Sequence, residues 1–340
     1  MKAMPMVYHE RYVEHIQGSR FHPESPERLL TIKKRLEEAD LWKELLTPEA
    51  LSERELQLVH TSRHIERLKN FGVGPLDPDT YMSENTYEIA KLAAGGTVCG
   101  LRHVIAHDEP VFVFPRPPGH HAGQGYCGGF CYFNNVAIAT KKFLEKLGKV
   151  AIVDIDVHHG NGTNDIFYQE DKVLFISTHQ YGIFPGTGHH TEVGSGAGRG
   201  YSLNIPFSAY AGDSSMLIAF DKIIMMALEQ FSPGAIIVSL GTDGHYNDPL
   251  SSNVMSSLVY AEVIKKLLHF AEENCQNRIL INLEGGYHLE SLAEIVTHLV
   301  SLVYTGEETE LKHKKVYDKE GNSLKSIRES KEFFAKFWEM

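Results

Sequence analysis

The sequence predicts an α/β protein with a central, mostly parallel β-sheet that helices cover on both faces. Short apolar segments alternate along the chain with longer segments of helical period, which is the pattern of repeated βαβ units. An apolar run such as 149–153 is typical of a strand buried on both faces. Together these two observations predict the fold class.

The predicted elements follow one another in a regular order. A proline-punctuated segment at 22–29 is expected to cap a helix that runs toward Leu41, because proline is favoured in the first helical turn. A second helix is expected at 86–106. Strands are then expected at 111–114, 149–153, 173–178, 202–206, 235–240 and 278–283, and helices at 135–147, 214–231, 254–274 and 289–303.

The end of the chain differs in composition from the rest. From about residue 306 to 340 it is charge-dense and mixed in sign, and it is expected to end in a surface helix at 327–338. Three phenylalanines of that helix, Phe333, Phe334 and Phe337, would pack back on the body. No low-complexity linker and no internal repeat divide the sequence, so we expect one domain over 1–340.

Composition excludes several classes of protein. A formal net charge of -11 over 340 residues argues against direct binding to nucleic acid or to an anionic membrane. No apolar run reaches the roughly 18 residues of a membrane helix, and the first residues have no signal-peptide core. We therefore expect a cytoplasmic protein. Four scattered cysteines indicate reduced thiols, and 19 histidines with three doublets favour metal or proton chemistry.

The segment 153–162 carries the strongest chemical signal. If the apolar strand continues, Asp154, Asp156 and His158 share one face of it and bring two oxygen donors and one nitrogen donor to one point. Two buried carboxylates without a cation would cost several kcal/mol, so a metal ion is the simplest explanation. The segment also ends a parallel strand, where ligands bind in open α/β sheets.

Other chemically active side chains also follow predicted strands. The pair His120–His121 comes after 111–114, Asp243 after 235–240, and Tyr287 after 278–283. One edge of the sheet would therefore collect all of them. Asp156, His158 and Asp243 make a three-ligand set with an open position, which is typical of catalytic zinc. Either histidine of the pair would take a proton from water, and Tyr287 would donate to an oxyanion, so the pattern predicts hydrolysis.

Several ordered motifs resemble those of the histone deacetylase superfamily, which also contains acetylpolyamine amidohydrolases and acetoin-utilisation-type proteins. They are HPESPER at 22–28, RPPGHH at 116–121, GFCYFNN at 129–135, DIDVHHGNG at 154–162, PGTG at 185–188 and EGGY at 284–287. The resemblance covers residues from about 22 to about 303. It implies an arginase-like three-layer sandwich and the removal of acetyl or other acyl groups from acyl-lysine side chains or related amines.

The resemblance also implies a role for each matching residue. It makes Asp156, His158 and Asp243 ligands of one Zn²⁺, His121 the general base, and Tyr287 the residue that polarises the acyl carbonyl. It places Phe130 and Phe184 on the walls of the acyl-lysine tunnel beside Gly129, and Asp77 or Asp79 at the rim. His120 would be oriented by Asp154, and a potassium ion would lie near Asp154, Asp156, His158, Ser177 and Thr178.

One position departs from part of the family. The expected partner of His121 is a carboxylate in some branches, but this chain has Asn161, as in the class II branch. An amide stabilises an imidazolium less than a carboxylate does, so the pKa of His121 is expected to be lower here.

Alternatives remain open. A two-metal ureohydrolase of the arginase type is disfavoured, because Gly241 stands where that pattern has a further Asp. A non-catalytic acyl-binding relative would have no use for the histidine pair and Tyr287. The substrate is either an acylated lysine of a peptide or protein or an acetylated polyamine, with Leu250 favouring the first. Whether His245 lines the entrance, whether Zn²⁺ or Fe²⁺ is native, and whether 10–21 makes a homo-oligomer contact stay open.

Overall fold

The structure is a computed structural model that describes residues 4–19, 21–318 and 321–340. Its centre is an eight-stranded sheet in the order β2-β1-β5-β10-β9-β6-β7-β8, and every neighbouring pair is parallel. The strands are β1 (Met6–Val7), β2 (Leu45–Leu46), β5 (Val111–Val113), β6 (Val150–Asp154), β7 (Val173–Gln180), β8 (Ser202–Phe207), β9 (Ala235–Leu240) and β10 (Ile279–Leu283). The predicted α/β class with a mostly parallel sheet is confirmed.

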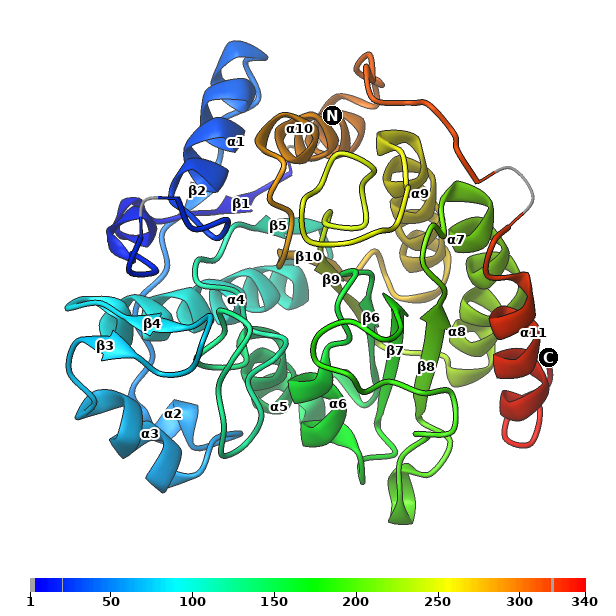
Figure 1. Cartoon of the computed structure of the whole chain (residues 1–340), viewed down its shortest axis with the longest axis horizontal. Helices are drawn as coiled ribbons and strands as arrows, with labels where there is room; N and C mark the ends of the chain where they lie inside the picture. Colours follow the sequence, from blue (N-terminus) through cyan, green and yellow to red (C-terminus); the bar gives the residue numbers. More distant parts are fainter. Residues whose placement is uncertain (1–3, 20, 319–320) are drawn as a thin grey trace.

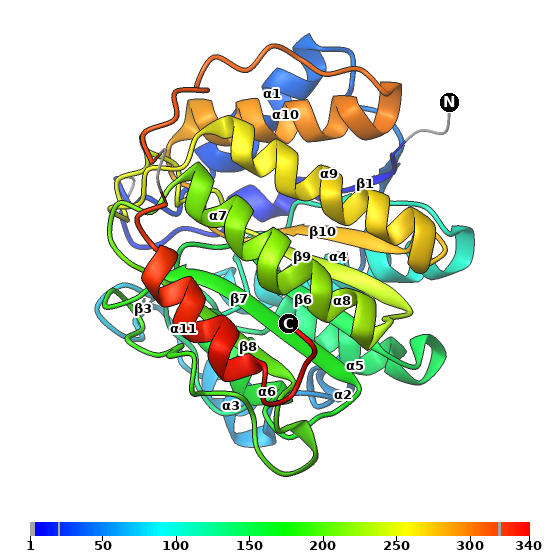
Figure 2. The same ribbon diagram turned by 90° about the vertical axis from the view of Figure 1, so that its right-hand side faces the viewer.

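Helices cover both faces of this sheet (Figures 1 and 2). One layer holds α1 (Glu27–Glu38), α7 (Asp213–Ala219), α8 (Met225–Phe231), α9 (Ser257–Asn274) and α10 (Leu289–Thr305), and the other holds α4 (Thr86–His107) and α5 (Asn135–Leu147). Shorter helices are α2 (Glu53–Leu56), α3 (Ser62–Lys69) and α6 (Asn161–Phe167), and a two-stranded antiparallel sheet pairs β3 (Gly74–Pro75) with β4 (Tyr81–Met82).

The three layers follow from the alternation of side chains along each strand. In β6, Ala151 and Val153 belong to one hydrophobic core, and Val150 and Ile152 belong to the other. Because successive residues of a strand point to opposite faces, a continuous apolar run supplies both cores at once. None of the helices in the described part of the chain combines the length and hydropathy that a membrane span requires.

Two of the predicted helices are interrupted or start later in the structure. The helix expected at 214–231 is divided by a π-helical turn, Phe220–Ile224, between α7 and α8. The helix expected at 254–274 starts only at Ser257, because Met255 forms a β-bridge with His245 and the Ser256 side chain caps the helix by accepting from the Leu258 amide.

The C-terminal helix, α11 (Leu324–Phe334), begins and ends earlier than predicted. Phe334 is buried, Phe333 and Phe337 pack partly buried against the core, and Trp338 donates from its indole to the Gly200 carbonyl over 2.8 Å. The helix lies next to β8 at the edge of the sheet (Figure 2). The prediction that its phenylalanines pack back on the body is confirmed.

The order of the strands decides where the polar loops meet. Strands β5, β10, β9 and β6 are consecutive neighbours in the sheet, and each is followed by one of the loops that carry the predicted site residues. Since all four are parallel, their carboxyl ends lie at the same edge. The segment 10–21, a predicted subunit contact, contains a 3₁₀-helix at Glu10–Glu14 and the highly exposed Phe21, while Arg20 lies outside the described residues.

Candidate active site

Asp156, His158 and Asp243 converge at this edge. One ligand atom from each lies within 4.8 Å of the other two. The Nδ1 atom of His158 is 3.2 Å from Asp156 Oδ1 and 3.0 Å from Asp243 Oδ2, and both carboxylates are buried. Burial alone would lower the pKa of His158, but the two carboxylates raise it to about 10. The carboxylates therefore favour a positive charge at this point, which a metal ion would supply.

Glycines leave the space that these ligands occupy. A Cβ atom on Gly241 would lie 2.1 Å from Asp156 Oδ2, and one on Gly285 would lie 2.4 Å from Asp243 Oδ2. The amide of Gly285 donates to Asp156 Oδ2 over 2.8 Å, and the amide of Val157 donates to Asp243 Oδ1 over 3.0 Å. Backbone amides thus hold both carboxylates in place, and a residue larger than glycine at position 241 or 285 would collide with them.

The prediction that Asp154 shares a strand face with the other two residues of its motif is wrong. Strand β6 ends at Asp154, and the chain then turns, with the Asp156 amide donating to Asp154 Oδ1 and the His158 amide donating to Asp156 Oδ1. Asp154 lies outside the ligand group and instead contacts His120, whose Nδ1 is 3.1 Å from Asp154 Oδ2. Turn hydrogen bonds, and not strand alternation, bring the ligands together.

The two histidines of the RPPGHH motif have different environments. His121 Nδ1 lies 2.7 Å from Asn161 Oδ1, and burial, followed by the nearby His120 and His158, lowers the pKa of His121 well below its ordinary value. Burial would also lower the pKa of His120, but Asp156 and Asp154 raise it to about 10. Because the lowered pKa keeps His121 neutral, its ring is free to accept a proton.

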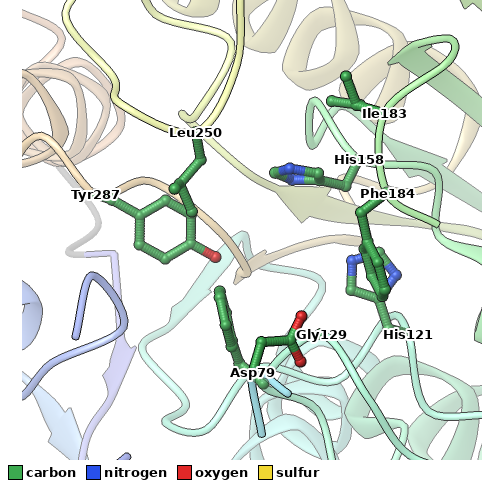
Figure 3. Close-up of a pocket in the computed structure, with 9 residues that line it drawn as sticks. Asp79, His121, Gly129, His158, Ile183, Phe184, Leu250 and Tyr287 are labelled. Atoms are coloured by element: carbon green, nitrogen blue, oxygen red, sulfur yellow. The ribbon is translucent and has the colours of Figure 1, made fainter. Parts of the chain in front are cut away.

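The site opens into a cavity of about 320 Å³. Its lining residues are Asp79, His121, Gly129, Phe130, His158, Ile183, Phe184, Leu250 and Tyr287. Figure 3 shows the Tyr287 hydroxyl pointing into this cavity. Burial raises the pKa of Tyr287 well above its ordinary value, so the hydroxyl keeps its proton and can donate it in a hydrogen bond.

Aromatic rings form much of the cavity wall. The ring of Phe184 packs edge to face on His121, with centroids 4.9 Å apart, and that of Phe130 packs in the same way on Tyr287 at 5.8 Å. Gly129 lies against the first pair, since a Cβ there would come within 2.4 Å of the His121 ring and 2.7 Å of the Phe184 ring. The predicted tunnel residues are therefore brought together with the predicted proton-transfer residues.

The rim contains one of the two predicted aspartates. Asp79 lines the cavity, whereas Asp77 accepts the Asp79 amide over 3.0 Å and closes a turn. His245, a possible entrance residue, is buried and outside the lining. Sequence reasoning missed Ile183, although its position next to Phe184 was a usable signal.

Two of the residues predicted near a potassium ion, Asp156 and His158, belong to the metal ligand group, and the others are Asp154, Ser177 and Thr178. Asp154 is in register with Ser177 on the neighbouring strand β7. The Ser177 hydroxyl lies 2.9 Å from His179 Nδ1, and Thr178 donates to the sulfur of Met216.

A buried ion network that supports the segment of Tyr287 was also not predicted from the sequence. Arg28 donates to the carbonyl of Gly286 over 2.7 Å and to that of Glu284, and so holds the segment that carries Tyr287. Glu24 accepts from Arg116 Nε over 2.7 Å and lies 3.4 Å from Arg28. The helix predicted to follow the HPESPER motif is α1, which begins at Glu27 with Pro26 at its N-cap, and Glu24 and Arg28 of the same motif also support the site.

The chain is similar to known deacetylases. Residues 22–303 match the family model of the histone deacetylase domain. A probable deacetylase of Archaeoglobus fulgidus is 39% identical over 293 residues, which cover 84% of this chain and 81% of that protein. A histone deacetylase-like amidohydrolase of Pseudomonas aeruginosa is 36% identical over 275 residues, covering 78% and 72%. The crystal structure of the HDA15 HD domain covers 100% of this chain and 97% of its own, with a TM-score of 0.89 and 31% identity.

Proposed function

The chain belongs to the histone deacetylase family, and we propose that it is a zinc-dependent amidohydrolase that removes acetyl or other acyl groups from acyl-lysine side chains. One observation carries the proposal. The Asp156, His158 and Asp243 ligand group adjoins a cavity that His121 and the Tyr287 hydroxyl also line. The parts of an amide hydrolysis site thus meet at one cavity.

The ligand group suits zinc. Two carboxylates and one imidazole, with a position left open, match the three protein ligands of catalytic zinc sites. When bound, Zn²⁺ polarises a carbonyl and lowers the pKa of a water molecule toward about 7. We also place a potassium ion next to Asp154, at the Ser177–Thr178 segment of β7, as a structural partner of this site.

Side chains of the protein itself transfer the protons and stabilise the developing charge. The free Nε2 of His121 takes the proton of the attacking water and later returns it to the leaving amine, a role worth about 10² to 10⁴ in rate. The Tyr287 hydroxyl donates a hydrogen bond to the carbonyl oxygen as negative charge develops on it. His120 lies beside the same point and is held there by Asp154.

The shape of the cavity favours an acyl-lysine. Phe130 and Phe184 would contact the aliphatic stem of the side chain, and Ile183 and Leu250 make the outer wall apolar. Asp79 is the carboxylate of this lining, and we propose that it accepts hydrogen bonds from the backbone amides of a peptide substrate. Leu250 in this lining offers no charge to the second ammonium group of a polyamine, which favours an acyl-lysine.

A two-metal ureohydrolase is disfavoured by the same geometry. A Cβ on Gly241 would already lie 2.1 Å from Asp156 Oδ2, so a further aspartate does not fit there while Asp156 keeps its position. The second metal of that mechanism therefore lacks its bridging ligand.

Acetate release by the zinc-loaded protein tests the proposal. An acetyl-lysine peptide and an N-acetylated polyamine are compared side by side, with Tyr287→Phe as the control. We expect the peptide to be the better substrate, and we expect the variant to keep zinc while its kcat falls by about 10²-fold to 10³-fold, because one oxyanion donor is lost. Preference for the polyamine would assign the enzyme to small-molecule metabolism, and normal turnover by the variant would refute the role of Tyr287.

A further inference from the structure

Hydrogen bonds connect the proposed base to the protein surface. His121 Nδ1 lies 2.7 Å from Asn161 Oδ1, Asn161 Nδ2 donates to the Tyr126 oxygen over 3.2 Å, and the Tyr126 hydroxyl donates to Asp165 Oδ2 over 2.5 Å. Asn161 and Asp165 lie four residues apart on α6, so they occupy the same face of that helix. His121 is buried and Asp165 is exposed.

The donors and acceptors that these side chains offer determine the orientation of the Asn161 amide. A carboxylate only accepts, so the single proton of the Tyr126 hydroxyl is directed to Asp165. The Tyr126 oxygen can then only accept from Asn161, which requires the Asn161 NH₂ group to face Tyr126. The amide oxygen must therefore face His121, and it can only accept from that ring.

The orientation of the amide determines which ring nitrogen of His121 carries the proton. A neutral imidazole carries one proton, and an acceptor at Nδ1 keeps that proton on Nδ1. The lone pair of Nε2 is then free to take a proton from water. If the amide were rotated by 180°, its NH₂ group would donate to Nδ1, the imidazole proton would move to Nε2, and His121 could not act as a base.

The surroundings hold Tyr126 and its proton in place. The ring lies directly on Gly123, where a Cβ would come within 2.3 Å of it. Burial, followed by the hydrogen bond to Asp165, raises the pKa of Tyr126 well above its ordinary value, so the hydroxyl stays protonated.

We propose that Tyr126 and Asp165 are positioning residues, which fix the orientation of the Asn161 amide and through it the tautomer of His121. This inference rests on the proposed function, in which His121 is the base. An amide in place of a carboxylate makes such a device necessary, because a carboxylate presents an acceptor to His121 whichever way it rotates, whereas an amide does so in only one of its two orientations.

A double-mutant cycle tests this. Tyr126→Phe should lower kcat about fivefold at unchanged KM, the factor that corresponds to one neutral hydrogen bond. In the Asn161→Asp background the same change should alter kcat by less than twofold, because the aspartate cannot present a donor. Tyr168→Phe, at the C-terminal end of the same helix, is the matched control and should keep wild-type kcat. Equal losses in both backgrounds would overturn the inference.

Nitrogen NMR of the zinc-loaded protein supplies a readout that does not depend on turnover. With ¹⁵N-labelled histidine, and the His121 signals assigned by their loss in His121→Ala, the wild type should show the proton on Nδ1. Tyr126→Phe should show a population with the proton on Nε2, and a spectrum identical to wild type would overturn the inference. If the wild-type protein hydrolyses no acyl substrate, the proposed function fails, while the NMR result still decides the role of Tyr126.

Discussion

Replacement of Glu24 by Gln should strongly destabilise the protein, although this residue touches no substrate. The Glu24 side chain is fully buried. It accepts from Arg116 over 2.7 and 3.2 Å and from Arg28 over 3.4 Å. Glu24→Gln keeps the size of the side chain but removes its charge. Among the described residues, Glu24 is the one anion that hydrogen-bonds to the buried guanidinium groups of Arg28 and Arg116, so both would lose it.

The magnitude follows from the charges around Glu24. Burial alone would raise the pKa of this carboxyl, but Arg116, aided by Arg28, holds it at about 2 against an ordinary value of 4.5. At about 1.4 kcal/mol per pKa unit, this corresponds to about 3 kcal/mol of stability. Removal of one partner of a buried ion pair costs about 3 to 5 kcal/mol in other proteins, so we expect a loss of this size.

The pH dependence has a definite sign. Because the pKa of Glu24 is lower in the folded protein, its contribution is fully present above the unfolded value of 4.5 and is lost as the pH falls toward about 2. Glu24→Gln should therefore lose most stability at neutral pH, and its difference from wild type should shrink as the pH falls from 4.5 toward about 2. Its kcat should also fall, since Arg28 holds the Gly286 carbonyl next to Tyr287.

Urea unfolding followed by circular dichroism at several pH values measures this effect. Glu27→Gln is the matched control, because Glu27 is an exposed carboxylate of the same motif and its loss should change stability by less than about 0.5 kcal/mol. A Glu24→Gln protein within 1 kcal/mol of wild type at pH 7 would refute the reasoning, since it would mean that the guanidinium groups do not need the buried charge.

Two further predictions concern the site. Asp243→Ala should lose both its bound zinc, as measured by elemental analysis, and its activity. Chelation of the wild type should abolish activity, and added Zn²⁺ should restore it. Stoichiometric zinc in the variant would mean that the ligand set is wrong. Gly129→Ala should lower kcat/KM at least about 10-fold, because the new Cβ would lie 2.4 Å from the His121 ring at a φ of +55°. Gly125→Ala, whose Cβ would meet its nearest neighbour at 3.9 Å, should behave as wild type, and equal kinetics for the two variants would show that the close approach at Gly129 does not matter.

Much of the site could be predicted because its residues follow strands directly. The pair His120–His121, Asp243 and Tyr287 each come a few residues after an apolar run, and parallel strands end at one edge. Where the local backbone departs from regular structure, prediction failed. Asp154 was expected to share a face with the metal ligands, but β6 ends at this residue and turn hydrogen bonds place the donors that follow.

The sequence by itself determined the α/β class, the succession of elements and the chemistry of the loops, because these depend on residues close together along the chain. Only the tertiary structure decided which strands are neighbours and which distant side chains meet. Arg28 holds a carbonyl 258 positions away, and the Tyr126 hydroxyl meets a carboxylate 39 positions away. Such contacts depend on how whole layers pack around a buried sheet, and no local periodicity records that packing.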